Sequence, residues 1–444
     1  MGDYSRRDFL KIGAGVAVGG ALGAGSDALI TDARAQAPTW TPQVEKGAKL
    51  RVMRWKRFVE GDERVWMENT KRFSDQFGVE VRVDSESFED IRPKAAVAAN
   101  VGQGPDIILG WYDDAHLYPD KLLPVTDVAE YLGRKYGGWY DVCRDYGMRG
   151  KDWIALPIGA NGGAMVYRKS MMNAAGVDTF PTTTDGYLKL AQALKAKGTP
   201  IGHALGHASG DATTWCYWIV WAHGAKLVDE KNNVAIDSPE TLAALEYVKA
   251  LYANFIPGTL GWLDPNNNKA FLDGQISVTN NAISIYYVAK NSPDEKLKAM
   301  AQDIEHASWP VGPVGRPTEL HQITQAMVFK YSKSPKAAKE YLRFMMEREQ
   351  YVPWQSASLG YVMQPLAAYE KSPIWTDEPK ARAFQRGMAN MRHHGYAGRL
   401  GYASAGAIAD FIIVDMVAEA ASGDKTPKQA AERAATRAQR YYKV

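Results

Sequence analysis

The stretch Asp106-Ile107-Ile108-Leu109-Gly110-Trp111 decides the fold class of this chain, because it continues an alternation of strands and helices. An alanine-rich segment over residues 90–101 precedes it, has a helical pattern and ends at Gly102 and Gly104. The run that follows is apolar and ends in a tryptophan before a polar loop. We therefore predict a strand over residues 106–111.

Two more strands and a helix are expected upstream of this stretch. Residues 50–55 form a short apolar run, and valines alternate with charged residues over 79–83. Between them, apolar side chains recur at helical spacing up to Gly78. Strands that alternate with helices predict a mainly parallel sheet, and ligands of such open sheets bind beyond the carboxyl ends of the strands. Trp55 and Trp111 stand at two such ends.

The pattern changes after Gly150. Predicted strands over residues 154–157 and 164–167 flank a break at Gly159–Gly163 that holds three glycines. Glycines in that position suit a chain that bends as it passes between two lobes. Further helices are predicted over residues 182–198, 238–251, 334–345, 405–421 and 427–442.

The composition narrows the class of protein. A chain of 444 residues is long for one core and favours two lobes. The formal charge of +3, from 53 basic and 50 acidic residues, is small and evenly spread, which excludes a surface for nucleic acid or for anionic membranes. The 13 Trp and 23 Tyr exceed what a core of this size needs, so many are expected to line a wet surface or cleft.

Cysteine and histidine usage gives no sign of a metal or cofactor site. Cys143 and Cys216 do not form a Cys-x-x-Cys pair, and they could be buried free thiols or a disulfide, since sequence separation says nothing about their distance. His203 and His207 lack the glutamate that the H-E-x-x-H motif places beside its first histidine. His393-His394 is more typical of a solvated loop than of a metal site.

The N-terminus has the features of an export signal. Arg6 and Arg7 precede Phe9-Leu10 and a weakly apolar, Gly/Ala-rich stretch, which is the pattern of a twin-arginine signal. Small residues before Ala35 predict cleavage after that residue, so residues 1–35 are the predicted signal peptide and the periplasm the predicted location. A membrane anchor is the alternative, but the run is poorly apolar for a permanent span.

Several motifs occur in the order found in a known family. They are Gly104–Ile108 followed by Trp111, Leu156–Ile158 leading to Met165–Lys169, Ala270–Gln275, Trp309–Pro313, Ser358–Tyr361 and Thr426–Ala430. Together they resemble the maltose-binding-protein-like branch of bacterial extracellular solute-binding proteins, family 1, which are components of ABC importers. The chain departs from the family pattern at Arg168, where Asn is usual, and at Thr184, where Trp is usual.

The resemblance implies a two-lobed α/β fold, the type II periplasmic-binding-protein fold. Each lobe would be a mainly parallel sheet flanked by helices, with crossing segments as hinges. Lobe one is expected over residues 40–160 plus 310–359, and lobe two over 161–309 plus 360–444. The implied protein is a monomer that captures a small neutral solute, a sugar or polyol, by hinge closure and delivers it to the permease subunits of an ABC importer. It would have no enzymatic activity, no cofactor and no nucleic-acid partner.

The candidate ligand-binding residues follow the crossings and the strand ends. An aromatic ring can cover the C–H face of a sugar while carboxylates and amides pair with its hydroxyls, since an unpaired buried hydroxyl costs roughly 1–3 kcal/mol. In lobe one and at the first crossing the candidates are Trp55, Trp111, Asp113, Asp114 and Asn161. In lobe two and at the other crossings they are Trp215, Asn280, Asn281, Trp309 and Tyr361.

A periplasmic enzyme exported by the twin-arginine pathway is the alternative function. An oxidoreductase of that kind needs a cofactor site, and the sequence contains no nucleotide-binding loop and no haem or cluster cysteines. A glycoside hydrolase needs two carboxyls that face each other about 5 Å or more apart across the scissile bond. Asp113 and Asp114 are adjacent in a loop, where that geometry is seldom reached.

Overall fold

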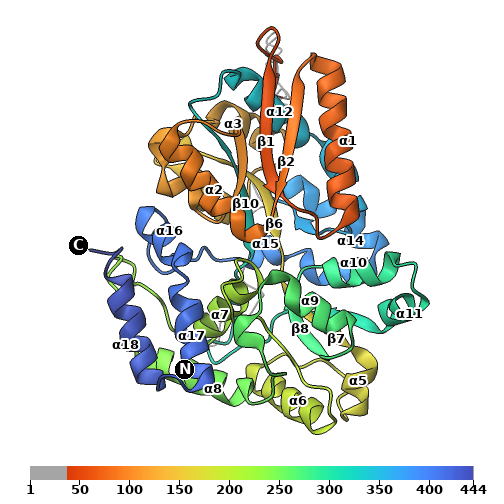
Figure 1. The fold of residues 1–444 in the computed structure, drawn as a ribbon, viewed down its shortest axis with the longest axis vertical. Helices are drawn as coiled ribbons and strands as arrows, with labels where there is room; N and C mark the ends of the chain where they lie inside the picture. Colours follow the sequence, from red (N-terminus) through yellow and green to blue (C-terminus); the bar gives the residue numbers. More distant parts are fainter. Residues whose placement is uncertain (1–37, 444) are drawn as a thin grey trace, which may run out of the picture. The chain divides into compact units, whose positions relative to one another are not determined.

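The computed structural model describes residues 38–443, which fold around two sheets. We call the body around the six-stranded sheet lobe one and the body around the three-stranded sheet lobe two. In Figure 1 lobe one is the upper part, with β1 and β2, and lobe two the lower part, with β7 and β8. The predicted signal peptide, residues 1–35, lies outside the described residues.

The sheet of lobe one has the strand order β11-β6-β10-β3-β1-β2. Its strands are β1 (Lys49–Trp55), β2 (Glu80–Glu86), β3 (Ile107–Trp111), β6 (Leu156–Asn161), β10 (Gln322–Val328) and β11 (Val362–Met363). The quoted apolar stretch forms β3, whose five residues are all buried at the centre of the sheet. The strands predicted over 50–55 and 106–111 are confirmed to within one residue at each end.

The sheet of lobe two is smaller and has the order β8-β7-β9. Its strands are β7 (Ala164–Arg168), β8 (Val278–Asn281) and β9 (Ile304–Ala307). A separate hairpin of β4 (Met148–Arg149) and β5 (Asp152–Trp153) belongs to neither sheet.

Strand direction differs from the expectation of mainly parallel sheets. Only the pairs β1–β2 and β1–β3 are parallel, whereas β10 and β11 run antiparallel to their neighbours and both pairs of lobe two are antiparallel. The reason is the exchange of chain between lobes. β6 leaves lobe one at Asn161 and β10 re-enters beside it at Gln322, so two neighbouring strands share the crossing end and run in opposite directions.

Helices pack around both sheets (Figure 1). Around lobe one these are α1 (Glu60–Phe77), α2 (Phe88–Val101), α3 (Thr126–Lys135), α4 (Asp141–Gly147), α12 (Pro335–Met345) and α13 (Arg348–Ala357). In lobe two they are α5 (Lys169–Ala174), α6 (Thr184–Ala196), α7 (Asp211–Ala222), α8 (Pro239–Tyr252), α9 (Asp264–Leu272), α10 (Ser284–Asn291), α11 (Glu295–Asp303), α17 (Ile412–Ser422) and α18 (Pro427–Ala438). The late segment adds α14 (Ile374–Asp377), α15 (Gly387–Asn390) and α16 (Tyr402–Ala409).

Local sequence signals set several helix ends. Ser87 accepts a hydrogen bond from the Asp90 amide and caps α2, which ends where Gly102 takes the left-handed conformation at φ 73°. Ser238 caps α8 in the same way, one residue before Pro239. The helix predicted over 405–421 is broken in two, because Phe411 adopts a left-handed φ of 51° between α16 and α17.

Two glycines carry the first crossing between the lobes. A Cβ atom on Gly162 would lie 2.5 Å from Met363 Sδ, and one on Gly163 would lie 2.9 Å from the ring of Trp309. The Gly163 amide donates to His321 Nδ1 at 3.1 Å, and its carbonyl accepts from Trp309 Nε1 at 2.8 Å. The bend therefore falls at Gly162–Gly163, while Gly159 remains inside β6.

The end of lobe one along the chain lies in a region that the sequence assigned to lobe two. Val362 pairs with Asn161 and Met363 with Ala160, so β11 is the edge strand of the sheet of lobe one. Further on, Leu366 forms a bridge with Trp139. The chain from 360 to about 366 thus packs with lobe one, although the expected boundary lay at residue 359.

The described residues also answer the question about the cysteines. Cys143 in α4 and Cys216 in α7 are separate, buried free thiols.

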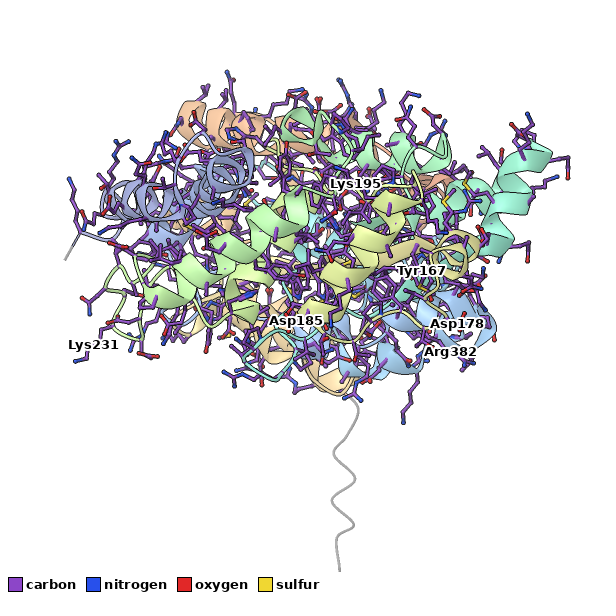
Figure 2. The ribbon with its side chains drawn as sticks, turned by 90° about the horizontal axis from the view of Figure 1, so that it is seen from below. Tyr167, Asp178, Asp185, Lys195, Lys231 and Arg382 are labelled. Atoms are coloured by element: carbon purple, nitrogen blue, oxygen red, sulfur yellow. The ribbon has the colours of Figure 1, made fainter. Side chains whose placement is uncertain are left out.

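Among the described helices, none combines the length and apolar character that a membrane crossing requires. The underside of lobe two shows acidic and basic side chains interspersed, among them Asp178, Asp185 and Lys195 (Figure 2).

A buried ion pair fixes α1 against the end of β1. The Arg54 guanidinium lies 2.5 Å from Asp62 Oδ2, with both side chains almost fully buried. Asp62 also accepts hydrogen bonds from Trp55 Nε1 at 3.0 Å and from Trp354 Nε1 at 2.8 Å. The guanidinium carbon is 4.3 Å from the centre of the Trp55 ring and 4.9 Å from that of Trp66. Removing one charge would leave the other buried without a partner.

We expect Asp62→Ala to lower the free energy of unfolding by about 3–5 kcal/mol, because Arg54 would remain charged and unpaired. Urea denaturation measures this change. The double variant Arg54→Met/Asp62→Leu should lose less free energy of unfolding than Asp62→Ala, because it leaves no buried charge without a partner. The matched control is Asp75→Ala in the exposed Lys71–Asp75 pair, where we expect no measurable loss. Equal effects of Asp62→Ala and Asp75→Ala would contradict this account.

Candidate functional site

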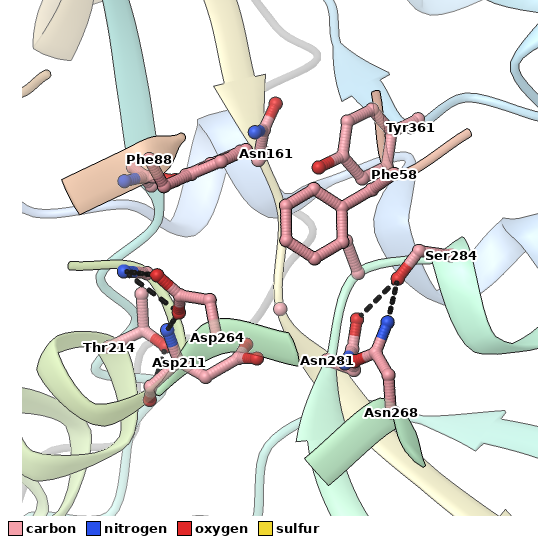
Figure 3. Close-up of a pocket in the computed structure, with 14 residues that line it drawn as sticks. Phe58, Phe88, Asn161, Asp211, Thr214, Asp264, Asn268, Asn281, Ser284 and Tyr361 are labelled. Atoms are coloured by element: carbon pink, nitrogen blue, oxygen red, sulfur yellow. Dashed lines mark hydrogen bonds between the residues drawn. The ribbon is translucent and has the colours of Figure 1, made fainter. Parts of the chain in front are cut away.

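A pocket opens between the two lobes where β6 and β10 meet the crossing (Figure 3). We call it the interlobe pocket. From lobe one and the crossings it is lined by Phe58, Phe88, Asn161, Gly163, Gln322 and Tyr361, and from lobe two by Gly210, Asp211, Thr214, Asp264, Asn268, Asn281, Ala282 and Ser284. The space is narrow, with ≈ 40 Å³ open to a water-sized sphere, which is room for a few water molecules.

Hydrogen bonds between the lobes explain why the pocket is narrow. Tyr287 of α10 accepts the Gly61 amide of α1 at 2.8 Å. Tyr112, which follows β3, donates to the Ser209 carbonyl just before α7 at 3.0 Å. These bonds hold the lobes close together, so a solute the size of a sugar ring needs them to separate before it can enter.

Phenylalanines form the apolar wall on the side of lobe one. Phe58 meets Phe88 edge to face, with ring centres 4.9 Å apart. Phe88 stacks in turn on Trp111 at 4.7 Å and 14° between the planes, and Trp55 lies behind it with its ring 6.5 Å away. The two tryptophans therefore support the wall, and the phenylalanine rings face the space.

Two side-chain amides lie in the pocket with unused hydrogen-bonding capacity. Asn161 is 7% exposed and neither its Nδ2 nor its Oδ1 has a partner. Gln322, its neighbour across the sheet, is 2% exposed and its Nε2 has none. A buried amide without a partner costs free energy of folding that a ligand hydroxyl could recover. Both residues stand at the end where β6 and β10 meet the crossing.

Two further amide side chains and a serine in the pocket already form hydrogen bonds with one another. Ser284 Oγ donates to Asn281 Oδ1 at 2.8 Å, and Asn268 Nδ2 donates to Ser284 Oγ at 3.0 Å. Asn281 Nδ2 closes the ring by donating to Asn268 Oδ1. Figure 3 shows this group on the wall of lobe two, at the opposite side from the acidic residues.

Two carboxyl groups share the other corner of the pocket. Asp264 accepts the backbone amides of Gly210 and Asp211, at 3.2 and 2.7 Å, and so closes the N-terminus of α7. Asp211 accepts from Asn267 Nδ2 at 2.9 Å. Burial raises the pKa of both carboxyls, and the proximity of Asp264 raises the pKa of Asp211 further. The pair therefore retains a proton to a higher pH than exposed aspartates do.

The structure brings three of the ten sequence candidates to the pocket. Asn161, Asn281 and Tyr361 line it. Trp55 and Trp111 lie in the second layer, with their Nε1 atoms bonded to Asp62 and to the Phe88 carbonyl. The sequence placed them at strand ends facing a cleft, but α2 begins directly over those ends and covers the indoles with Phe88.

Asp113 and Asp114 are buried in ion pairs away from the pocket. Asp113 Oδ1 lies 3.0 Å from His394 Nε2, and its Oδ2 accepts from Ser404. Burial alone would raise the pKa of Asp113, but His394 and Ser404 hold it below its usual range. Asp114 accepts from Arg92 Nε at 2.7 Å. His394 is 1% exposed, so the expectation of a solvated His393-His394 loop is wrong at this residue.

The remaining three candidates are structural in their contacts. Trp215 is fully buried in lobe two and donates to the Ala204 carbonyl at 2.6 Å. Asn280 is buried one residue before Asn281 and its Oδ1 bonds to His203 Nδ1 at 2.6 Å. Trp309 is held at the crossing by Gly163.

Several lining residues were not found from the sequence. They are Phe58, Phe88, Asp211, Thr214, Asp264, Asn268, Ser284 and Gln322. The Gly210-Asp211 start of α7 and the run Asp264-Pro265-Asn266-Asn267-Asn268 are polar helix starts, which was the available signal. Nothing in the sequence shows that these two starts lie together. Among the described residues no group of three or more histidine, cysteine or acidic side chains is arranged to hold a metal ion.

We expect Asp211→Asn to stabilise the protein at neutral pH and not in acid. The pKa of Asp211 is raised in the folded state, so above the ordinary Asp value the folded state holds a proton that the unfolded chain does not, and stability falls as the pH rises. The asparagine variant has no carboxyl at this position, so its stability does not fall with pH for this reason. Its melting temperature should exceed that of the wild type at about pH 7.5 and match it at about pH 4.

The control for this change is Asp178→Asn, an exposed aspartate in the loop between α5 and α6 (Figure 2). Its difference from the wild type should not grow between the two pH values. If Asp211→Asn raised the melting temperature equally at both pH values, the pKa of Asp211 would not be raised in the folded state.

Comparisons with known proteins agree with this architecture. Over 199 residues the chain is 22% identical to a putative binding protein of Brucella abortus, a match covering 44% of this chain and 46% of the relative. The chain thus spans about half the length of these curated relatives.

Solved structures cover more of the chain. Maltose-bound MalE3 of T. maritima superposes with a TM-score of 0.75 at 19% identity, over 88% of this chain and 99% of the other. A solute-binding protein of an ABC transporter from Agrobacterium radiobacter K84, in complex with ribitol, superposes with a TM-score of 0.73 at 15% identity, over 89% and 99%. These similarities confirm the two-lobed α/β fold with sheets flanked by helices.

The N-terminus and the body of the chain each match a known sequence family. Residues 3–23 match the signal sequence of the twin-arginine translocation pathway, which confirms the predicted export route to the periplasm. Residues 69–383, most of the mature chain, match the family described as bacterial extracellular solute-binding protein. The chain therefore belongs to the bacterial extracellular solute-binding proteins.

Proposed function

We propose that this protein captures a small polyhydroxylated solute, a sugar or polyol, in the interlobe pocket and hands it unchanged to the permease of an ABC importer. The observation that carries the proposal is the pair of buried amides in the pocket: both polar atoms of Asn161 and the Nε2 of Gln322 lack partners. Hydroxyl groups both donate and accept, so they suit both atoms of such an amide.

The apolar wall supports the same class of ligand. Phe58 and Phe88 offer ring faces and edges to the C–H groups of a sugar or polyol chain, while Asn161 and Tyr361 offer polar groups beside them. The similar structures were solved with maltose and with ribitol bound, one a sugar and one a polyol. We propose Asn161, Asn281 and Tyr361 of the original candidates as contacts, joined by Gln322.

Lobe closure completes the proposal. The Tyr287–Gly61 and Tyr112–Ser209 bonds cross between the lobes, and they can form only when the lobes approach. The solute contacts both lobes only when they approach each other around it, and so it shifts the equilibrium away from the open form. We propose that the two lobes expected from the sequence, residues 40–160 plus 310–359 and residues 161–309 plus 360–444, move as two bodies about Gly162–Gly163. The one change that we make is to move residues 360–366 from the second body to the first. The protein acts as a monomer and is no enzyme.

A thermal-shift screen of hexoses, disaccharides and alditols tests the binding function. A ligand at 100 times its dissociation constant should raise the free energy of unfolding by about 2.7 kcal/mol, because it binds only the folded state. Analysis of the sugars after incubation should find them unaltered. Absence of any shift across the screen, or conversion of a sugar to product, would rule the function out.

We expect Asn161→Leu to weaken the binding of any sugar found in that screen by about 10- to 100-fold. The amide would lose its hydrogen bonds to the ligand, a cost of roughly 1–3 kcal/mol. The free variant should be at least as stable as the wild type, because the unpartnered amide is gone. Titration calorimetry measures the affinity and thermal melting the stability.

The control for Asn161→Leu is Asn173→Leu, the same change at an exposed position of α5. It should leave the affinity unchanged. If Asn161→Leu binds as tightly as the wild type, Asn161 does not contact the solute.

A further inference from the structure

Among the described residues, the interlobe pocket is lined by acidic side chains and by no basic ones. Of the residues that line it, only Asp211 and Asp264 are ionisable carboxyls, and no basic side chain accompanies them. Glu89, in the first turn of α2, acts on Asp264 from the side of lobe one, and its buried Oε1 has no hydrogen-bond partner. The pocket thus contains an acidic corner without a described cation on its wall.

Two buried arginines of lobe one are paired with other carboxylates. Arg54 pairs with Asp62, and Arg92 pairs with Asp114. All four of these side chains are largely buried, so neither arginine is available to turn toward the pocket. A positive charge for the acidic corner has to come from outside the described chain or from a proton.

The two carboxyl groups of the acidic corner, Asp211 and Asp264, differ in their hydrogen-bond donors. Asp264 accepts two backbone amides at the N-terminus of α7, and the helix dipole compensates its charge. Asp211 has one side-chain donor, the amide of Asn267. An ionised carboxylate can accept about four hydrogen bonds, so Asp211 is the group with capacity left for a ligand.

We propose that the solute carries a protonated amine which pairs with Asp211, so that the ligand is an amino sugar or an amino polyol. This narrows the proposed function and rests on it. The ammonium group would form a charge-assisted hydrogen bond in a site shielded from water. The unpartnered amides of Asn161 and Gln322, both more than nine-tenths buried, would bind the hydroxyl groups of the same molecule.

The arrangement in the pocket fits a ligand with two different ends. Figure 3 shows Asp211 and Asp264 at one side of lobe two, with Asn161 on lobe one and the Asn281 group at the other side. A molecule that spans the pocket meets acid at one end and amides at the other. The Phe58 ring between them can lie along its carbon chain.

Ionisation of Asp211 links this binding to pH. The groups that face it are Asp264 and Asn267 from lobe two, and Tyr112 and Tyr361 from lobe one, with Glu89 near Asp264. None of these carries a positive charge. Burial and Asp264 raise the pKa of Asp211, so the amine must displace a proton from the pair. Affinity for the amine should therefore rise as the pH rises, until the amine itself loses its proton.

Matched pairs of ligands test the inference on the full mature protein. We would measure D-glucosamine, D-galactosamine and D-mannosamine against glucose, galactose and mannose, and 1-amino-1-deoxy-D-glucitol against D-glucitol, by titration calorimetry. At least one amine should bind about tenfold or more tightly than its neutral twin. Its advantage should shrink from about pH 7 to about pH 5.5, as the carboxyl pair takes up its proton. N-acetylation, which removes the charge, should abolish the advantage.

Asp211→Asn should erase the preference for the amine, so that the amine and its neutral twin bind within about threefold of each other. Thermal melting reports that the variant is folded. Asp185→Asn, the exposed aspartate of α6, should retain the preference. If neutral members bind as well as the amines in the wild type, or if Asp211→Asn keeps the preference, this inference is overturned and the proposed function stands. If neither neutral sugars nor amines bind, both fall together.

Discussion

The lobes meet where two glycines allow three chain crossings to pack against one another. Gly162 lies against Met363 at the third crossing and Gly163 against Trp309 at the second, at distances where an added Cβ atom would force the neighbouring side chain to move. The Trp309 indole and His321 both bond to Gly163. Asn161, one residue before this contact, and Gly163 both line the pocket, so the contact sets where the first crossing places its polar groups.

The aromatic side chains are used mainly for support. Trp55, Trp66 and Trp354 surround the buried Arg54–Asp62 pair, and Trp111 backs Phe88. A large rigid ring held on its far side gives a wall that does not yield when a ligand presses on it. The abundance of tryptophan therefore reports a well-supported cleft, although the rings that line it are phenylalanine and tyrosine.

The local part of the site could be predicted, and the long-range part could not. Asn161 and Tyr361 were found because they flank crossings, where a bend between strands leaves a mark in the sequence. Asp211 and Asp264 come from two helix starts, and only the meeting of the N-termini of α7 and α9 puts their carboxyls together. Asp113 and Asp114 follow a strand end like true cleft residues, yet Arg92 and His394 from distant segments bury them.

The sequence by itself determined the alternation of strands and helices, their caps, the export signal and the glycine bend, because each of these depends on neighbours within a few residues. Tertiary structure alone decided the strand directions, since β10 returns from lobe two on one side of β6, and β11 follows α13 of lobe one and pairs on the other side of β6. It also decided which polar groups are left without partners in the pocket. Such a shortage exists only when atoms far apart in the chain are brought together and water is excluded.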